Sequence, residues 1–193
     1  MSRSLARVAC LVLSLAHISA VVSGVPTFNR TVGEVQVGTC EGLRRNVELG
    51  LDIAIIVTSD LVCSETITLS PGQDVSVASA PFQNYLVLIA EDFAVSDPTD
   101  ATLLVNPESA VLTLDGLVFA NEAGNEGSPG AARAVWNAGT LHVYGCSFQS
   151  LNYASRQDGG AIYSTGEPGS NSGGFVTVRD SFFVGNVAKD HGG

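Results

Sequence analysis

The sequence predicts an all-β fold, a right-handed parallel β-helix (a solenoid) with a short N-terminal capping helix. Two observations predict it: a short-strand motif recurs along the second half of the chain, and glycines follow these strands where a coil must turn. A third, a basic and then apolar N-terminus, predicts secretion. The chain is therefore divided into a signal peptide over residues 1–24, an N-terminal cap over residues 25–60 and parallel β-helix repeats over residues 61–193.

The N-terminus has the composition of a secretory signal peptide. Arg3 and Arg7 give a basic start without an acid, and residues 8–22 form an apolar run. Small residues follow, so cleavage is expected after Gly24 or Ala20. The run is shorter than the roughly 20 apolar residues of a membrane span, although an uncleaved anchor is the alternative. The mature protein is expected to be secreted, either extracellular or at a cell surface.

The charge of the chain excludes some partners. Nine Lys and Arg residues stand against 19 Asp and Glu residues, a net charge of −10. Nucleic-acid affinity depends largely on Lys and Arg contacts with phosphates, so nucleic acid is not an expected partner, and neither is an anionic membrane surface. No run after the signal peptide is long and apolar enough to span a membrane, so no transmembrane segment is expected in the mature chain.

Three segments align without gaps and define the repeat. Each has apolar residues at its first, third and eighth positions and a turn-forming pair before the sixth. The alternation predicts short strands with one face inward and one outward, and the turn pair ends each strand after a few residues. The segments are Leu112–Phe119, Leu141–Phe148 and Val176–Phe183.

A second motif precedes two of these strands. Gly159–Gly166 matches Ala132–Gly139, and copies of the motifs are offset by 27 to 35 residues. Short strands at this spacing cannot bury a face alone, whereas stacked coils bury it and place parallel ladders along the axis. A mature chain of this length makes about five coils. Earlier strands are expected within residues 66–69, 75–77, 86–88 and 103–105.

The sequence stops on Gly192 and Gly193, where the Gly-Gly motif begins again. The repeat array is therefore predicted to be truncated, with no capping element after the coil of Val176–Phe183. An uncovered coil exposes unpaired strand edges and part of the apolar stack. The isolated chain is expected to self-associate end to end.

The two motifs resemble the repeats of the polymorphic outer membrane protein family, which carry Gly-Gly-Ala-Ile/Leu/Val and Phe-x-x-Asn stretches. The copy at Ala132 lacks both glycines, and the resemblance covers about residues 103–193. It implies a pectin-lyase-like β-helix displayed at a bacterial surface, in the outer membrane, for adhesion. Anchoring by a C-terminal membrane barrel, as in that family, is not carried over. The residues that match the two stretches are Gly159, Gly160, Ala161 and Ile162 in the first and Phe183 and Asn186 in the second.

A helix is expected in the cap. From Cys40 onward, Leu43 and Val47, with Leu51 after them, fall on one helical face, and charged residues lie off it. Such a helix over the first coil covers an otherwise open β edge and its apolar stack.

Three cysteines remain after removal of the signal peptide, so at most one internal disulfide forms. Cys63 lies near the start of the strand that follows the cap, and the predicted disulfide joins it to Cys40. Cys146 occupies the inward position held by Leu117 and Ser181 in the neighbouring copies, which predicts a buried small hydrophobe.

Two features predict an association with carbohydrate: a glycosylation sequon and a pair of aligned aromatic residues. Asn29 begins the one N-x-S/T sequon, so in a eukaryotic host the protein is expected to be a glycoprotein. Trp136 and Tyr163 align, and if Val135 and Ile162 face the core, the two rings point outward on adjacent coils about 4.8 Å apart. Such rings can hold a sugar ring. The alternative is that they stack on each other and stiffen the sheet.

Asparagines near the turns are expected to be structural. Their side chains can cap backbone groups at the corners and stack as a ladder. These residues are Asn137, Asn152 and Asn186.

No metal, cofactor or catalytic group is predicted. The acids of residues 91–100 lack the spacing of a calcium-binding loop, and no cation lies between Arg45 and Arg133 to act as a lyase base. His142 is expected on the outward face, without a Ser, Cys or metal partner.

The expected function is non-enzymatic: a secreted or cell-surface module for adhesion or for cell-wall and polysaccharide association. Its expected partner is an extracellular glycan or a surface protein. Two alternatives remain, a pectate-lyase-like carbohydrate-active enzyme and a non-functional fragment of a larger surface protein.

Overall fold

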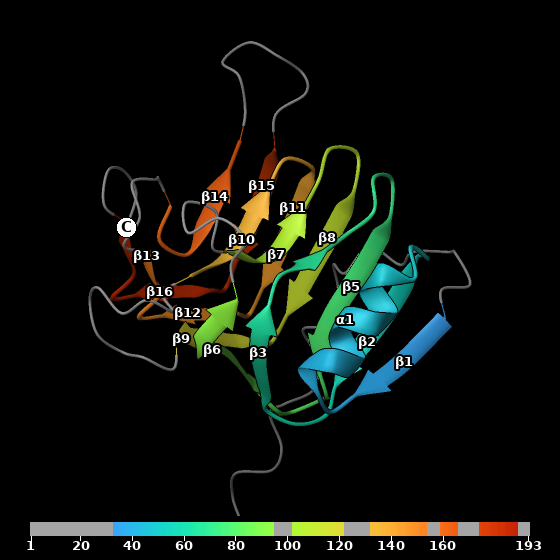
Figure 1. The fold of residues 1–193 in the computed structure, drawn as a ribbon, viewed down its shortest axis with the longest axis horizontal. Helices are drawn as coiled ribbons and strands as arrows, with labels where there is room; N and C mark the ends of the chain where they lie inside the picture. The colour runs from blue at the N-terminus through green and yellow to red at the C-terminus, as the bar shows by residue number, and fades with distance from the viewer. Residues whose placement is uncertain (1–32, 95–101, 122–131, 154–158, 166–173, 189–193) are drawn as a thin grey trace, which may run out of the picture. The chain divides into compact units, whose positions relative to one another are not determined.

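The described part of the chain is a stack of short parallel strands with one helix (Figure 1). A computed structural model describes residues 33–94, 102–121, 132–153, 159–165 and 174–188, and all structural statements concern these residues. They belong to one compact unit, Val32–Gly193. In chain order the elements are β1 (Gly33–Val37), α1 (Cys40–Glu48), β2 (Ile53–Val57), β3 (Leu61–Glu65), β4 (Ile67–Thr68), β5 (Asp74–Ser79), β6 (Leu86–Ala94), β7 (Thr102–Asn106), β8 (Val111–Asp115), β9 (Val118–Asn121), β10 (Arg133–Asn137), β11 (Thr140–Tyr144), β12 (Ser147–Gln149), β13 (Asn152–Tyr153), β14 (Ile162–Ser164), β15 (Phe175–Arg179), β16 (Phe182–Val184) and β17 (Val187–Ala188).

The strands form three stacked parallel sheets, here called A, B and C. Sheet A has the order β1-β2-β5-β8-β11-β15, sheet B the order β16-β12-β9-β6-β3 and sheet C the order β14-β10-β7-β4, while β13 pairs with β17. Along the chain, β2, β3 and β4 lie in A, B and C in turn, and β5 returns to sheet A beside β2. This order is that of a parallel β-helix, so the predicted fold class is confirmed. The five coils begin at β2, β5, β8, β11 and β15.

The predicted alignment of the three repeat copies is the register of sheet A. Leu141 pairs with Leu112 on one side and with Val176 on the other, and both strand pairings run in parallel without a shift. The inward residues of β8 and β11 are fully buried, as strand alternation requires. Apolar residues at every second position therefore stack into continuous columns through the coils.

Two-residue corners join sheet A to sheet B in the last three coils. The first corner residue has a positive φ, +65° at Gly116, +57° at Gly145 and +51° at Asp180. Glycine suits the first two because a left-handed backbone has no steric cost without a Cβ. The second corner residue, Leu117 or Cys146, is fully buried. The corner thus turns the chain and at once returns a side chain to the core.

Sheet B carries an aromatic column through the core. Phe148 is fully buried, with its ring centroid 5.1 Å from that of Phe119 and 4.8 Å from that of Phe183, and the planes are within 10° of parallel. The column continues through Val87 to Leu61 in the earlier coils. Offset stacked rings gain about 0.5–1.5 kcal/mol beyond their burial. Phe183, in the fifth coil, is 47% exposed.

An asparagine ladder runs along the end of sheet C. The Nδ2 group of Asn106 donates to Asn137 Oδ1 at 2.6 Å and to the Thr140 carbonyl at 2.9 Å. Asn137 Nδ2 in turn donates to Ser164 Oγ at 3.2 Å and to the Phe175 carbonyl at 3.4 Å. Both asparagines are fully buried, so these bonds offset the cost of burying amides. The predicted structural role of Asn137 is confirmed.

Asn186 caps the following corner. Its Oδ1 atom accepts a hydrogen bond from the Leu151 backbone N–H at 3.0 Å, and its Nδ2 group donates to the Phe148 carbonyl at 3.0 Å. One side chain thereby satisfies two main-chain groups of the neighbouring coil, which confirms its predicted role. The side chain of Asn152 lies outside the described residues.

The predicted capping helix is α1. Thr39 caps its start, since its Oγ1 atom accepts from the Gly42 N–H at 3.1 Å. Leu43 and Val47 are buried against β1–β4. Placing Leu51 on the same face was wrong: the helix ends at Glu48, and Leu51 is 61% exposed. The helix therefore covers the N-terminal end of the stack with two apolar side chains.

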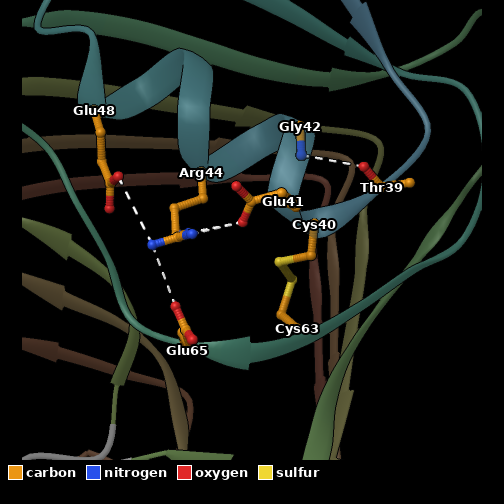
Figure 2. A network of polar contacts seen from close by, with 8 residues as sticks. All are labelled: Thr39, Cys40, Glu41, Gly42, Arg44, Glu48, Cys63 and Glu65. Atoms are coloured by element: carbon orange, nitrogen blue, oxygen red, sulfur yellow. Dashed lines mark hydrogen bonds and ion pairs between the residues drawn. A yellow bond between two sulfur atoms is a disulfide. The ribbon is translucent and has the colours of Figure 1, made fainter.

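The predicted disulfide joins Cys40 of α1 to Cys63 of β3 (Figure 2). Beside it, Arg44 lies among carboxylates: its Nη2 atom is 2.6 Å from Glu41 Oε2, and its Nη1 atom is 3.2 Å from Glu65 Oε2 on β3. The hydrogen bond to Glu41 holds the pKa of Arg44 above its ordinary value, so the guanidinium stays charged. The cap is thus bound to the first coil by a covalent bond and by one ion pair, Arg44–Glu65.

Candidate functional site

Trp136 and Tyr163 occupy adjacent strands of sheet C. β10 and β14 pair in parallel, with Val135 opposite Ile162 and Trp136 opposite Tyr163. Val135 is fully buried, and both aromatic side chains are half-buried. The register on which the sugar-stacking prediction depends is therefore confirmed. The sugar-binding role itself stays a prediction.

A buried arginine contacts one ring of the Trp136 and Tyr163 pair. Arg133, at the start of β10, is fully buried, and its guanidinium carbon is 4.9 Å from the centroid of the Tyr163 ring. A cation over a ring face is stabilising, by about 0.5–2 kcal/mol. The described ring contacts include no Trp136–Tyr163 pair, so the alternative of mutual stacking is not what the structure shows. One face of the Tyr163 ring is therefore occupied by the Arg133 guanidinium.

The Gly-Gly-Ala-Ile stretch has a packing role. Gly159 has a φ of +77°, and a Cβ added at Gly160 would lie 2.8 Å from the carbonyl oxygen of Val187 in the next coil. Glycine is needed where two backbones approach so closely. The Ala161 carbonyl accepts from the Ala134 N–H at 3.0 Å, which ties the stretch to the preceding coil. The residues that carry the family resemblance therefore serve the stacking of coils.

Cys146 is a buried free thiol, as predicted. Burial raises its pKa to about 11, so the group stays protonated at neutral pH. A protonated, inaccessible thiol is neither a nucleophile nor a metal ligand. Its Sγ atom lies 3.3 Å from the Tyr144 carbonyl oxygen, to which it donates weakly.

Several predictions fall outside the described residues. These are the signal peptide and its cleavage position, glycosylation at Asn29, the start of a new motif at Gly192 and Gly193, and the side chains of the acids within residues 91–100. Among the residues that are described, no three His, Cys, Asp or Glu side chains lie close enough together to hold a metal ion. In the same part of the chain no helix has both the length and the apolar character of a membrane span.

The outer face of sheet A carries a second aromatic group that the sequence analysis missed. His142 and Tyr144 of β11 have ring centroids 6.1 Å apart and planes within 10° of parallel. The neighbouring strands place Asp115 and Arg179 on either side of Tyr144. Asp115 is exposed, and the loss of part of the water around its carboxyl group raises its pKa. The sequence carries a signal for this pair, because period-two alternation puts Tyr144 on the same outward face as His142.

No protein-family model, curated protein or solved structure matches this chain.

Proposed function

We propose that this chain is a secreted, non-enzymatic β-helix module that binds extracellular polysaccharide in adhesion or wall association. The observation that carries the proposal is the outward aromatic row of sheet C, where Trp136 lies next to a Tyr163 ring fixed by Arg133. A ring held on a rigid sheet can receive the apolar face of a pyranose with little loss of conformational entropy. The disulfide and the acidic composition support an extracellular location.

The family resemblance supports the same proposal in a finer form. The residues of Gly159–Ile162 and Phe183–Asn186 match repeats of the polymorphic outer membrane protein type, and in this chain they serve coil stacking and corner capping. In that family the repeats form a domain that is displayed at the cell surface and associated with adhesion. We infer that the stacked coils of this chain form a scaffold and that side chains on its outer faces bind the ligand.

Trp136 is expected to report sugar binding directly. It is the one tryptophan of the chain, so its fluorescence is expected to change when the mature protein is titrated with neutral and acidic polysaccharides. Trp136→Ala is expected to weaken retention on the bound polysaccharide about tenfold, because the stacking surface is lost. Affinity electrophoresis in gels that contain the polysaccharide measures the retention.

Two controls make this result specific. The melting temperature of Trp136→Ala must match that of the parent, and Trp136→Phe, which keeps a ring, is expected to retain most of the binding. An unchanged fluorescence and an unchanged retention across all polysaccharides would contradict the proposal. Release of unsaturated products from an acidic polysaccharide in the presence of calcium would contradict its non-enzymatic part.

The fifth coil is proposed as a self-association surface of the 193-residue chain. Its exposed apolar side chains include Phe175, Phe182 and Val184, of which Phe182 is 68% exposed. Within the described residues, β15 and β16 are also the outermost strands of sheets A and B. Apolar side chains beside unpaired strand edges favour pairing with a second chain. We expect a sedimentation coefficient that rises with concentration in analytical ultracentrifugation.

The matched variant is Val184→Lys, because this exposed change adds a charge without removing core packing. It is expected to shift the protein to the monomer. A parent that remains monomeric at high concentration would exclude self-association through this coil. Any coil that follows Gly193 in a longer chain would cover the same surface.

A further inference from the structure

The outer face of sheet A presents six side chains in two rows across three strands. Thr113, His142 and Thr177 share one row, and Asp115, Tyr144 and Arg179 share the next. The inward residues between them on β8 and β11 are fully buried, so alternation directs the two rows away from the core. We call these six residues the sheet A face. At the strand spacing of about 4.8 Å, each row spans about 10 Å.

The centre of the sheet A face is aromatic. The His142 and Tyr144 rings are nearly parallel, with centroids 6.1 Å apart, and both side chains are half-buried. In the described part of the chain, His142 Nδ1 is enclosed without a hydrogen-bond partner, which leaves Nε2 as the ring nitrogen for a ligand. Rings fixed on a sheet offer a rigid surface to the C–H groups of a sugar.

Hydrogen-bonding groups lie on both sides of the rings. Thr113 and Thr177 flank His142, while Asp115 and Arg179 flank Tyr144 and are both exposed. Neither charged residue forms an ion pair within the described residues. A carboxylate accepts from hydroxyls, a guanidinium donates to them, and a threonine does both. Polar groups around an aromatic centre are the usual composition of a sugar subsite.

The charges of the face favour a neutral ligand over an acidic one. Asp115 and Arg179 balance each other, and the whole chain carries a net charge of −10. A polyanion therefore meets long-range repulsion with a single cation on the face to offset it. A neutral, hydroxyl-rich chain meets no such repulsion and can use both the acceptor and the donor.

We propose that the sheet A face is a second glycan-binding site, separate from Trp136, that takes neutral hexose polysaccharide. It rests on the proposed function, because it specifies the ligand class of a polysaccharide-binding module. Tyr144 and His142 pack against pyranose rings, Asp115 accepts from hydroxyls on one side, and Arg179 donates on the other. Two sites on different sheets of one rigid scaffold let a single module hold two glycan chains or two stretches of one chain.

The test uses the mature protein and four defined hexasaccharides. Cellohexaose, laminarihexaose and mannohexaose are the neutral probes, and hexagalacturonate is the acidic one. Isothermal titration calorimetry gives the Kd and stoichiometry for the parent, Tyr144→Ala, Arg179→Gln and Trp136→Ala. Phe82→Ala is the matched control, because it removes an aromatic ring that is fully exposed outside the sheet A face. NMR signals of the His142 imidazole provide a local readout.

We expect the parent to bind at least one neutral probe and to shift the His142 signals. Tyr144→Ala is expected to raise the Kd for that probe about tenfold, as loss of one stacking ring predicts, while Phe82→Ala leaves it unchanged. Arg179→Gln is expected to weaken binding less, since it retains a donor. Tyr144→Phe is expected to bind like the parent if the variants are equally folded.

The outcomes separate this proposal from the proposed function. If Trp136→Ala abolishes binding and Tyr144→Ala leaves it intact, the sheet A site is overturned and the proposed function is not. Preference for hexagalacturonate would overturn the neutral ligand class. Parent protein that binds none of the four probes and no polysaccharide in the retention gels would overturn both proposals.

Discussion

Replacing Phe148 with alanine is expected to lower the free energy of unfolding by about 3–5 kcal/mol. The ring is fully buried and stacks on Phe119 at 5.1 Å and on Phe183 at 4.8 Å, so truncation leaves a cavity bounded by two rings. Neighbouring coils cannot close it, because their backbones are fixed by parallel ladders on either side. Urea unfolding followed by circular dichroism measures the change, which corresponds to a drop of about 10 °C in Tm.

The loss of stability depends on how deeply each ring is buried in the aromatic column of sheet B. Phe183→Ala is expected to cost less, since that ring is already 47% exposed. Phe82→Ala, at a fully exposed ring, is expected to change stability by less than about 0.5 kcal/mol. Equal losses for Phe148 and Phe82 would show that the aromatic column does not hold the coils together.

Removing the disulfide is expected to cost about 3 kcal/mol. The bond closes a loop with a sequence separation of 23 residues, and in the chain-entropy model a loop of this size restricts the unfolded chain by about that amount. The double variant Cys40→Ala, Cys63→Ala is the direct test, because alanine leaves no buried hydroxyl where Cys63 is now fully enclosed. Its midpoint in urea is expected to fall, and the slope is expected to rise, because the unfolded chain without the crosslink exposes more surface to the denaturant.

A reducing agent supplies the matched control. Dithiothreitol is expected to lower the stability of the parent to that of the double variant and to leave the double variant unchanged. Cys146→Ala, which leaves the disulfide intact, is expected to remain sensitive to the reductant. A parent whose stability is the same with and without dithiothreitol would contradict the assigned role of the bond.

The register of the coils could be predicted because two local signals coincide in each of the three repeat copies. Leu112, Leu141 and Val176 are the second residues of strands with the same alternation, and a two-residue corner follows each strand at the same distance. A shift of one residue would place every apolar side chain on the outer face, so the pairing has one favourable solution. The same reasoning placed Trp136 opposite Tyr163.

Strand β1 shows where sequence patterns are insufficient. Gly33–Val37 contains two valines among polar residues and a glycine, and most of its side chains are exposed. It becomes a strand because β2 offers a free edge, with which it pairs over five residues. Pairing of this kind depends on the neighbouring element and leaves little trace in the composition of the segment.

Arg133 is a second case. The sequence shows only that this residue is a cation within a strand, whereas the structure buries it fully and places it over the Tyr163 ring of the next coil. The contact joins residues 30 positions apart, so it follows from the stacking of coils and not from local spacing. The same holds for Arg44 and Glu65, which meet only because α1 packs on the first coil.

The connections between the sheets differ in length, and this difference has an evolutionary consequence. From sheet A to sheet B the last three coils use two residues, whereas from sheet B to sheet C the chain runs from Asn121 to Arg133 in one coil and from Gln149 to Ile162 in the next. The described pairs of sheets A, B and C lie outside residues 122–131, so a change in chain length between Asn121 and Arg133 leaves their register unchanged. The connection from Gln149 to Ile162 is more constrained, because Leu151 is fully buried, β13 pairs with β17, and Gly160 lies against Val187 of the next coil. The connection of the third coil can therefore diverge in length and chemistry between descendants while the scaffold stays constant, and new specificities can arise there without loss of the fold.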